Sequence, residues 1–211
     1  ASFRHVTNKL GAGETLPVIK ADQPQVLGSR AYNPQQVALI CERLAPHNAL
    51  ATEIAYTAGL RAHELLTLQP RSERTPDPRP ALPTKFEGRE DGSRYVVTGK
   101  GGLIREVQLP SHLAARLEAQ RLATPRPVTD RHVYYQQHYA IGGGQPWSMA
   151  VSRAAKAALG WSTGAHGLRH AYAQERVTEL QTLEHSQKVA NETVSQELGH
   201  FRPEITTTYL R

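Results

Sequence analysis

The stretch AHGLRHAY, residues 165–172, places two histidines and one arginine within five positions. Positions i, i+3 and i+4 of a helix share one face, so His166, Arg169 and His170 are predicted to point the same way. Such a cationic cluster could bind an anion or move protons. Two other interpretations stay open. The histidines could be partly buried hydrogen-bonding residues beside a surface arginine, or they could share a zinc ion, although the motif H-E-x-x-H needs a glutamate where Gly167 stands.

Three further segments contain residues of similar chemical character: TAGLRAHEL, TGKGG and LGHFRPEITTTYLR. Together with HGLRH, and in this order along the chain, they resemble the tyrosine recombinase (phage integrase) family over residues 33–211. Nine positions separate His200 from Tyr209, which agrees with the family pattern. The resemblance implies a catalytic set of two paired arginines, one hairpin lysine, two histidines and one tyrosine nucleophile, which are Arg61, Arg169, Lys100, His166, His200 and Tyr209.

These residue types suit the transfer of a DNA phosphodiester to a protein hydroxyl. The guanidinium groups of Arg61 and Arg169 can bind non-bridging phosphate oxygens bidentately, without a metal ion. A phenol with a pKa near ~10 attacks poorly while it is protonated. Tyr209 therefore needs a proton acceptor or a strongly positive pocket, and His166 can supply both.

For each of the other candidate residues, a catalytic role competes with a simpler structural one. His200 could hydrogen-bond the phosphate. Lys100 is the candidate general acid for the departing 5′ oxygen, provided that nearby cations depress its pKa, but a Gly-Lys-Gly-Gly turn is more often a solvated hairpin tip. Arg61 could merely pair with Glu64 one helical turn further on, and such a pair would also orient it. His170 is expected to support the site by a hydrogen bond rather than to transfer a proton.

The tail that contains the tyrosine is expected to be weakly held. A helix is predicted to start at Pro203, and three consecutive threonines in it cost ~0.5 kcal/mol each relative to alanine. We therefore predict that Tyr209 is displaced from the pocket, or only loosely held near it, until phosphate and a neighbouring protomer bind. The alternative is a tyrosine that only packs the tail against the domain.

The polar segment 176–195 looks longer than is usual in the family. It is interpreted as an inserted loop or an extended helix that binds a partner or regulates the activity.

Most of the elements that must position these residues are predicted to be helical. One helix is predicted to begin at the cap Asn33-Pro34, a second to cover ALATEIAYTAG and end at Gly59, and a third to cover LRAHELLTL from Arg61. A fourth, HLAARLEAQRL, follows the cap Ser111, and a fifth, SMAVSRAAKAALG, runs from the cap Ser148 to Gly160. The run SRYVVTGKGGLIREVQL predicts a β-hairpin with Lys100 at its turn. Residues 70–92 contain many prolines and charges and are predicted to be irregular, with a short strand near TKFEG.

The sequence thus predicts an α+β domain, mainly α-helical with a small antiparallel sheet, which is the tyrosine recombinase catalytic-domain fold, over residues 33–211. Residues 1–32 are predicted to be a linker or the tail of a missing N-terminal DNA-binding domain. A net charge of +6 favours a polyanionic partner. With no membrane-length apolar run, no signal peptide and a lone structural cysteine, Cys41, a soluble cytoplasmic protein of the bacterial nucleoid is expected.

The predicted function is a site-specific recombinase domain of a mobile element that cleaves and rejoins double-stranded DNA through a 3′-phosphotyrosyl link. No cofactor or metal is expected, because the covalent link conserves the phosphodiester energy. Expected partners are DNA, further copies of the chain in a tetrameric synapse, and directionality or host factors. Alternatives are a type IB topoisomerase-like relaxing enzyme and a non-catalytic DNA-binding module. A metal-dependent nuclease ranks last, because the aspartates are scattered at Asp22, Asp77, Asp91 and Asp130.

Overall fold

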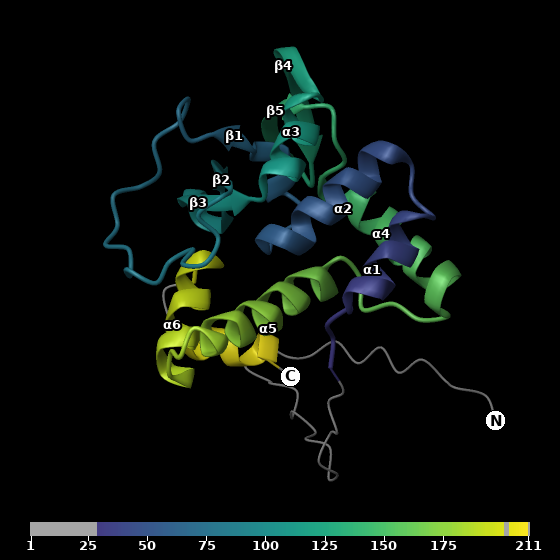
Figure 1. The fold of residues 1–211 in the computed structure, drawn as a ribbon. Helices are drawn as coiled ribbons and strands as arrows, with labels where there is room; N and C mark the ends of the chain where they lie inside the picture. The colour runs from purple at the N-terminus through teal and green to yellow at the C-terminus, as the bar shows by residue number, and fades with distance from the viewer. Residues whose placement is uncertain (1–28, 201–202, 211) are drawn as a thin grey trace, which may run out of the picture.

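The computed structural model describes residues 29–200 and 203–210 of the chain (Figure 1). The α-helices α1 to α6 span Pro34–Cys41, Pro46–Ala58, Ser111–Glu118, Gly144–Leu159, His166–Thr182 and Gln187–Glu197. The strands β1 to β5 span Gln69–Pro70, Ser93–Thr98, Ile104–Leu109, Arg121–Asp130 and Val133–Tyr139. Three 3₁₀ segments, η1 to η3, span Glu64–Thr67, Lys100–Gly102 and Pro203–Leu210.

The predicted fold class is confirmed, since the described residues form a mainly helical domain with two small antiparallel sheets. The first sheet has the order β1-β2-β3, and its β2–β3 pair is the predicted hairpin, with Tyr95 opposite Val107. The second sheet is the β4–β5 pair, which the sequence did not predict. This pair lies at the end of the molecule opposite α5 and α6 (Figure 1).

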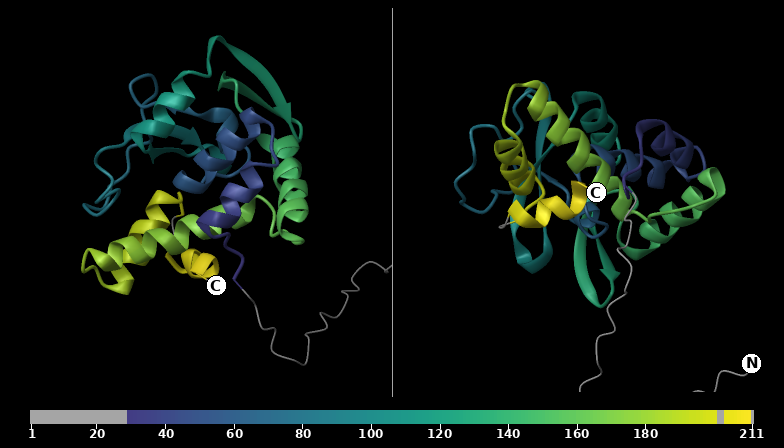
Figure 2. Two further views of the ribbon diagram at one scale, coloured as in Figure 1. Left: turned by 45° about the vertical axis from the view of Figure 1, so that its right-hand side comes forward. Right: turned by 90° about the horizontal axis from the view of Figure 1, so that it is seen from below.

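Two apolar clusters hold the helices together. In the larger one, α1 and α2 pack with α4 around buried side chains such as Ile54, Trp147 and Val151. The smaller one joins α5, α6 and η3, and Tyr172, which the sequence predicted to be a core residue, belongs to it together with Tyr209. Both views in Figure 2 show α5, α6 and η3 grouped together at one side of the molecule.

Helix-end signals in the sequence predicted the start of α1 and the end of α2 correctly. Asn33 caps α1 through a reciprocal pair of hydrogen bonds with Gln36, and Pro34 occupies the first helical position. Gly59 ends α2 in the left-handed conformation with a φ of 61°, where a Cβ would lie 2.7 Å from side-chain atoms of Tyr172 and Leu198. The close approach of α5 to the end of α2 therefore requires glycine at this position.

The prediction that Arg61 opens a helix is wrong. Arg61 precedes a short 3₁₀ segment, because the Glu64 carboxylate accepts the Arg61 main-chain N–H at 2.8 Å and closes a turn there instead. The short strand expected near TKFEG is also absent from the described residues, which form turns at 83–88. There the Phe86 main-chain N–H donates to the Glu197 carboxylate rather than to a strand partner.

Two predicted helix caps are wrong because other residues take their place. Ser111 is the first residue of α3 rather than its cap, and its hydroxyl donates to the Asp91 carbonyl. Helix α3 ends at Glu118, and Arg121 already begins β4. Ser148 lies inside α4, which starts four residues earlier because the Asp130 carboxylate accepts the Gln145 main-chain N–H at 2.8 Å. The predicted end at Gly160 is confirmed.

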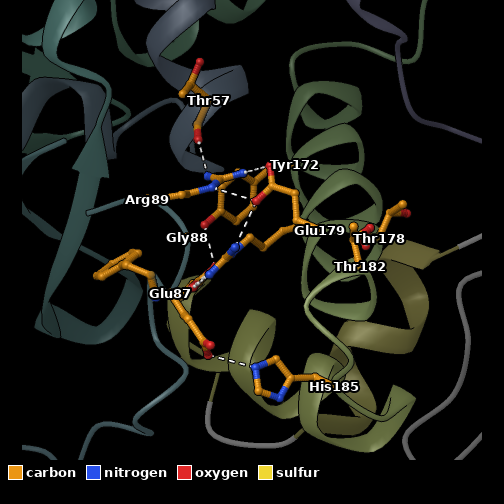
Figure 3. A network of polar contacts seen from close by, with 12 residues as sticks. Thr57, Glu87, Gly88, Arg89, Tyr172, Thr178, Glu179, Thr182 and His185 are labelled. Carbon is orange, nitrogen blue, oxygen red and sulfur yellow. Dashed lines mark hydrogen bonds and ion pairs between the residues drawn. The ribbon is translucent and has the colours of Figure 1, made fainter. Parts of the chain in front are cut away.

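Segment 176–195 forms the second half of α5, a turn and most of α6, so part of it extends a helix as predicted. Figure 3 shows how the connection before β2 attaches to it. Arg89 donates to the Glu179 carboxylate at 2.7 and 2.9 Å and stacks over the Tyr172 ring, and His185 bonds Glu87 at 2.8 Å. The segment is thus anchored in the domain on one side.

The packed domain begins before residue 33. Tyr32 is 1% exposed and stacks on Trp161 with 5.5 Å between ring centroids. Residues 1–28, which make up most of the predicted linker, lie outside the described residues. No helix within the described ranges is long and apolar enough to cross a membrane.

The Glu197 side chain is expected to be critical for stability, because it is 1% exposed and accepts hydrogen bonds from Arg176, Tyr172 and the Phe86 main chain. Glu197→Gln should lower the free energy of unfolding by about 3 kcal/mol or more, since the buried Arg176 charge loses its buried carboxylate partner and keeps the more exposed carboxylate of Glu179 at 2.9 Å. Urea denaturation measures this, with Glu42→Gln on the exposed end of α1 as the control. Equal losses for both variants would contradict the assignment.

Candidate active site

A buried carboxylate, that of Glu64, stands at the centre of the cationic cluster. Its oxygens lie 2.9 Å from Arg61 Nη1, 2.8 Å from Arg105 Nη2 and 3.9 Å from Arg169 Nη1. Burial alone would raise the pKa of Glu64, but the three guanidinium groups overcome that effect and hold it well below its usual range. One ionised carboxylate therefore faces three arginines, which leaves the cluster with an excess of positive charge.

Arg169 is fully buried at the meeting point of two helix ends. Its guanidinium donates to the carbonyl of Gly59, the C-cap of α2, and at 2.5 Å to the carbonyl of Leu198, the C-cap of α6. Burial lowers the pKa of Arg169 to about 10, while Glu64 opposes the shift, so the side chain stays charged at neutral pH. Helix C-termini carry partial negative charge, and two of them face this cation.

His200 lies directly against both motif arginines. Its Nε2 is 3.3 Å from Arg61 Nη2 and 3.1 Å from Arg169 Nη2. Because guanidinium groups only donate, Nε2 must accept, and the ring proton is assigned to Nδ1. Burial and the neighbouring arginine charges lower the pKa of His200 to about 3. The ring is therefore neutral at pH 7.

Tyr209 is in the pocket, so the predicted displacement of its side chain is wrong. The residue is 7% exposed, and its ring centroid lies 5.3 Å from that of His166, 4.8 Å from that of His170 and 5.3 Å from that of His200. The Arg169 guanidinium lies over the ring at 5.5 Å. Burial of the aromatic ring against α5 and α6 supplies the packing that the threonine-rich sequence did not suggest.

The main chain at the tyrosine is also held. His170 Nδ1 and Gln174 Nε2 each lie 3.2 Å from the Tyr209 carbonyl oxygen, and both donate to it. His170 thus contacts the tail by a hydrogen bond to the backbone. The tail itself is a 3₁₀ helix rather than an α-helix.

His166 begins α5 and is exposed, whereas His170, one helical turn further on, is buried. Its imidazole meets that of His170 edge to face, with 5.3 Å between centroids. Partial desolvation, with the positive charges of His170, Arg169 and Arg61, lowers the pKa of His166 to about 4. The imidazole is consequently neutral at pH 7 and able to accept a proton.

Lys100 is not brought into the cluster. It lies in the exposed η2 turn, and among the described residues it makes no hydrogen bond or ion pair. The turn itself is close by, since a Cβ on the adjacent Gly99 would lie 3.4 Å from Glu64 Oε1. The other five predicted catalytic residues and the two supporting ones, Glu64 and His170, do converge.

Sequence reasoning missed Arg105, which is 5% exposed and bonds Glu64 directly. A signal was present in the strand IREVQL. Alternation in a strand places Arg105 on the same face as Val107 and Leu109, both of which are buried. An arginine on a buried strand face needs a partner, and the only carboxylate of the motif segments TAGLRAHEL and TGKGG is Glu64.

The candidate metal pair His166 and His170 gains no further ligands. Within the described part of the chain, no group of three or more histidines, cysteines, aspartates or glutamates is arranged to hold a metal ion. The thiol of Cys41 is only partly exposed, and burial raises its pKa to about 12, which fits the predicted structural role.

No protein-family model and no curated protein matches this chain. Solved structures do resemble it. The XerH site-specific recombinase bound to a palindromic difH substrate in a post-cleavage complex aligns with a TM-score of 0.54 and 18% identity, covering 86% of this chain and 49% of that one. XerA recombinase aligns with a TM-score of 0.53 and 15% identity, covering 93% and 62%.

A lambda integrase dimer bound to a COC′ core site aligns with a TM-score of 0.53 and 18% identity, covering 91% of this chain and 50% of that one. These likenesses show that the chain has the tyrosine recombinase catalytic-domain fold. The chain spans 49% to 62% of the length of the three structures, so it corresponds to a part of each.

The lowered histidine pKa values predict how stability depends on pH. The unfolded chain takes up protons on its histidines near pH ~6.5, whereas folded His166 and His200, with pKa values of about 4 and about 3, do not. The free energy of unfolding should therefore fall as the pH is lowered from about 7 to about 5. Urea denaturation at both pH values measures the decline.

His200→Gln and His166→Gln should each reduce that decline, and His112→Gln, on the exposed start of α3, is the control. A pH dependence that is the same in all three variants would show that these two histidines are not held neutral by the fold.

Proposed function

We propose that this chain is the catalytic domain of a site-specific recombinase, which cleaves and rejoins double-stranded DNA through a 3′-phosphotyrosyl intermediate. The observation on which the proposal depends is a set of buried N–H donors around the tyrosine. Arg169 Nε and His200 Nδ1 are buried against the Tyr209 ring, and neither has a hydrogen-bond partner among the described residues. Unsatisfied buried donors are costly and rare in native proteins.

A bound oxyanion would satisfy the unpaired N–H donors and would also balance the excess positive charge of the cluster. Its oxygens accept hydrogen bonds without donating, and its charge offsets the excess of three arginines over one carboxylate. A DNA phosphate has two non-bridging oxygens, and their negative charge grows as a nucleophile adds to phosphorus. A cluster of fixed donors next to a buried phenol is therefore suited to phosphoryl transfer from DNA to Tyr209.

The proposed reaction balances with residues of the chain alone. Tyr209 Oη attacks phosphorus and its proton passes to His166, whose neutral imidazole can accept it. The bond from phosphorus to the 5′ oxygen breaks, and Lys100 on the adjacent η2 turn donates a proton to that oxygen once DNA brings the two together. Attack of a 5′ hydroxyl on the phosphotyrosine reverses the step, so no energy-supplying cofactor is needed.

The proposal extends to partners. The XerH and lambda integrase structures that share this fold are complexes with DNA, which supports double-stranded DNA as the substrate. By the resemblance of its motifs, the chain would act in a tetrameric synapse, with directionality or host factors, in the movement of a mobile element in the bacterial nucleoid. Roles for Arg61 and His200 in binding the phosphate belong to the same proposal.

A type IB topoisomerase-like enzyme would use the same chemistry without exchanging strands between two sites. Relaxation of a supercoiled plasmid that carries no recombination site would favour it. A non-catalytic DNA-binding module would be favoured by DNA binding without any covalent adduct.

Removal of the tyrosine hydroxyl tests the proposal directly. Tyr209→Phe keeps the ring that packs against His166, His170 and His200, so folding and DNA affinity should be preserved, while formation of a covalent DNA adduct should be abolished. A nicked duplex that traps the adduct, with the linked peptide mapped by mass spectrometry, gives the readout. Tyr56→Phe, at a tyrosine outside the site, is the control. An adduct that persists in Tyr209→Phe would place the nucleophile elsewhere.

Chelation tests the role assigned to the arginines. If guanidinium groups stabilise the phosphate charge, DNA cleavage should continue at an unchanged rate in excess chelator. The measurement is adduct formation on the same nicked duplex with and without chelator. Loss of cleavage that magnesium or zinc restores would favour the metal-dependent nuclease instead.

A further inference from the structure

Arg105 connects two parts of the cluster that are distant in sequence, Glu64 and the end of α6. From strand β3 its Nη2 donates to Glu64 Oε2 at 2.8 Å, and its Nη1 donates to the carbonyl of Glu197 at 2.6 Å. The Glu197 carbonyl lies in the last turn of α6, three residues before His200. The side chain is thus a bridge between the carboxylate at the centre of the cluster and the chain that leads to His200.

The contacts of Glu64 show what depends on this bridge. Oε1 faces Arg61 Nη1, whereas Oε2 accepts from the Arg61 main chain and from Arg105. Arg169 lies further away, at 3.9 Å from Oε2. Among the described residues, Arg105 is therefore the only side chain that donates a hydrogen bond to Oε2, and it opposes rotation of the carboxylate away from Arg61 and Arg169.

At its other end, the Arg105 side chain packs closely against the backbone at Gly199. Gly199 has a φ of 72°, and a Cβ there would lie 2.7 Å from Arg105 Cδ and 3.2 Å from Arg105 Nε. The backbone before His200 thus runs directly over the Arg105 side chain. Movement of Arg105 would shift this backbone and, with it, the imidazole that meets both motif arginines.

We propose that Arg105 is a positioning residue of the active site, which links Glu64 to the C-terminal end of α6 so that Arg61, Arg169 and His200 converge on one phosphate. This inference rests on the proposed function. Arginine suits the role because its two Nη groups reach separate acceptors from a rigid plane. A lysine ammonium is a single point of charge and would reach Glu64 or the Glu197 carbonyl, with less control of geometry.

The first test separates positioning from DNA binding. Arg105→Lys should lower the single-turnover rate of adduct formation by about 10- to 100-fold, the range seen when groups that orient site residues are lost, with little change in DNA affinity. Arg105→Gln, which also removes the charge, should be slower still. The matched control is Arg89→Lys, since Arg89 also donates to one carboxylate and one main-chain carbonyl, those of Glu179 and Thr57. A wild-type rate in Arg105→Lys would overturn the proposal.

A double-mutant cycle tests whether Arg105 acts through Glu64. If it does, Arg105→Lys combined with Glu64→Gln should be about as slow as Glu64→Gln alone, because the carboxylate that Arg105 orients is already gone. Rate losses that multiply would show that Arg105 acts independently, and that result would contradict the bridge.

A readout that needs no reaction keeps this inference distinct from the proposed function. Arg105 is the closest charge to Glu64 and contributes most to its lowered pKa, so Arg105→Gln should raise the pKa of the Glu64 carboxyl toward its ordinary range. Titration of side-chain carboxyls by ¹³C NMR measures this in the free protein, with Arg89→Lys as the control. An unchanged Glu64 titration would overturn the bridge, whereas failure of the wild-type chain to form an adduct would overturn only the proposed function.

Discussion

The buried carboxylate of Glu64 is the constraint on which the rest of the site depends. Three guanidinium groups come together around it, from the turn after α2, from β3 and from α5. Like charges at such short range repel strongly in a medium that screens less than water. A single ionised carboxylate makes their approach possible without cancelling the charge, and the residual positive field is what an anion would meet.

Arg169 shows how the fold keeps a fully buried cation. Its guanidinium donates to the carbonyls of Gly59 and Leu198, which cap two helices at their negative ends. Gly59 allows this because its left-handed backbone turns the chain where α5 passes closely. Helix capping, helix packing and the electrostatics of the cluster are thus parts of one arrangement, and a change in any of them moves the arginine.

The histidines near Tyr209 have different surroundings and therefore different capacities. His200 accepts from two arginines, which ties its ring nitrogen to the cluster, whereas His170 donates to the backbone of the tail. His166 stands at the start of α5 and is the most exposed of the three, and its lowered pKa keeps its imidazole neutral. Packing of one tyrosine ring against three imidazoles holds the phenol close to all these groups.

The sequence by itself determined the features that depend on local rules. The cap at Asn33, the left-handed stop at Gly59, the β2–β3 hairpin and the shared face of His166, Arg169 and His170 all follow from side-chain and backbone preferences within a few residues. The resemblance of the motif segments to the tyrosine recombinase family was sufficient to name seven of the eight side chains that converge. Arg105 was missed, and Lys100, which was also named, lies outside the cluster. The cap, the helix stop, the hairpin and the shared helix face need no knowledge of distant parts of the chain.

Only the tertiary structure decided the rest, because distant residues change the local balance. Strand β4 contains Pro125 and Pro127, which argue against a strand, yet a two-stranded sheet leaves β4 an open edge where proline is tolerated. Three threonines predicted a displaced tyrosine, but the Tyr209 ring is buried against three histidines, and such contacts cannot be judged from local propensity. Arg105 joins the site through contacts with Glu64 and Glu197, residues 41 and 92 positions away in the chain, and such contacts form only when the helices and the sheet pack together.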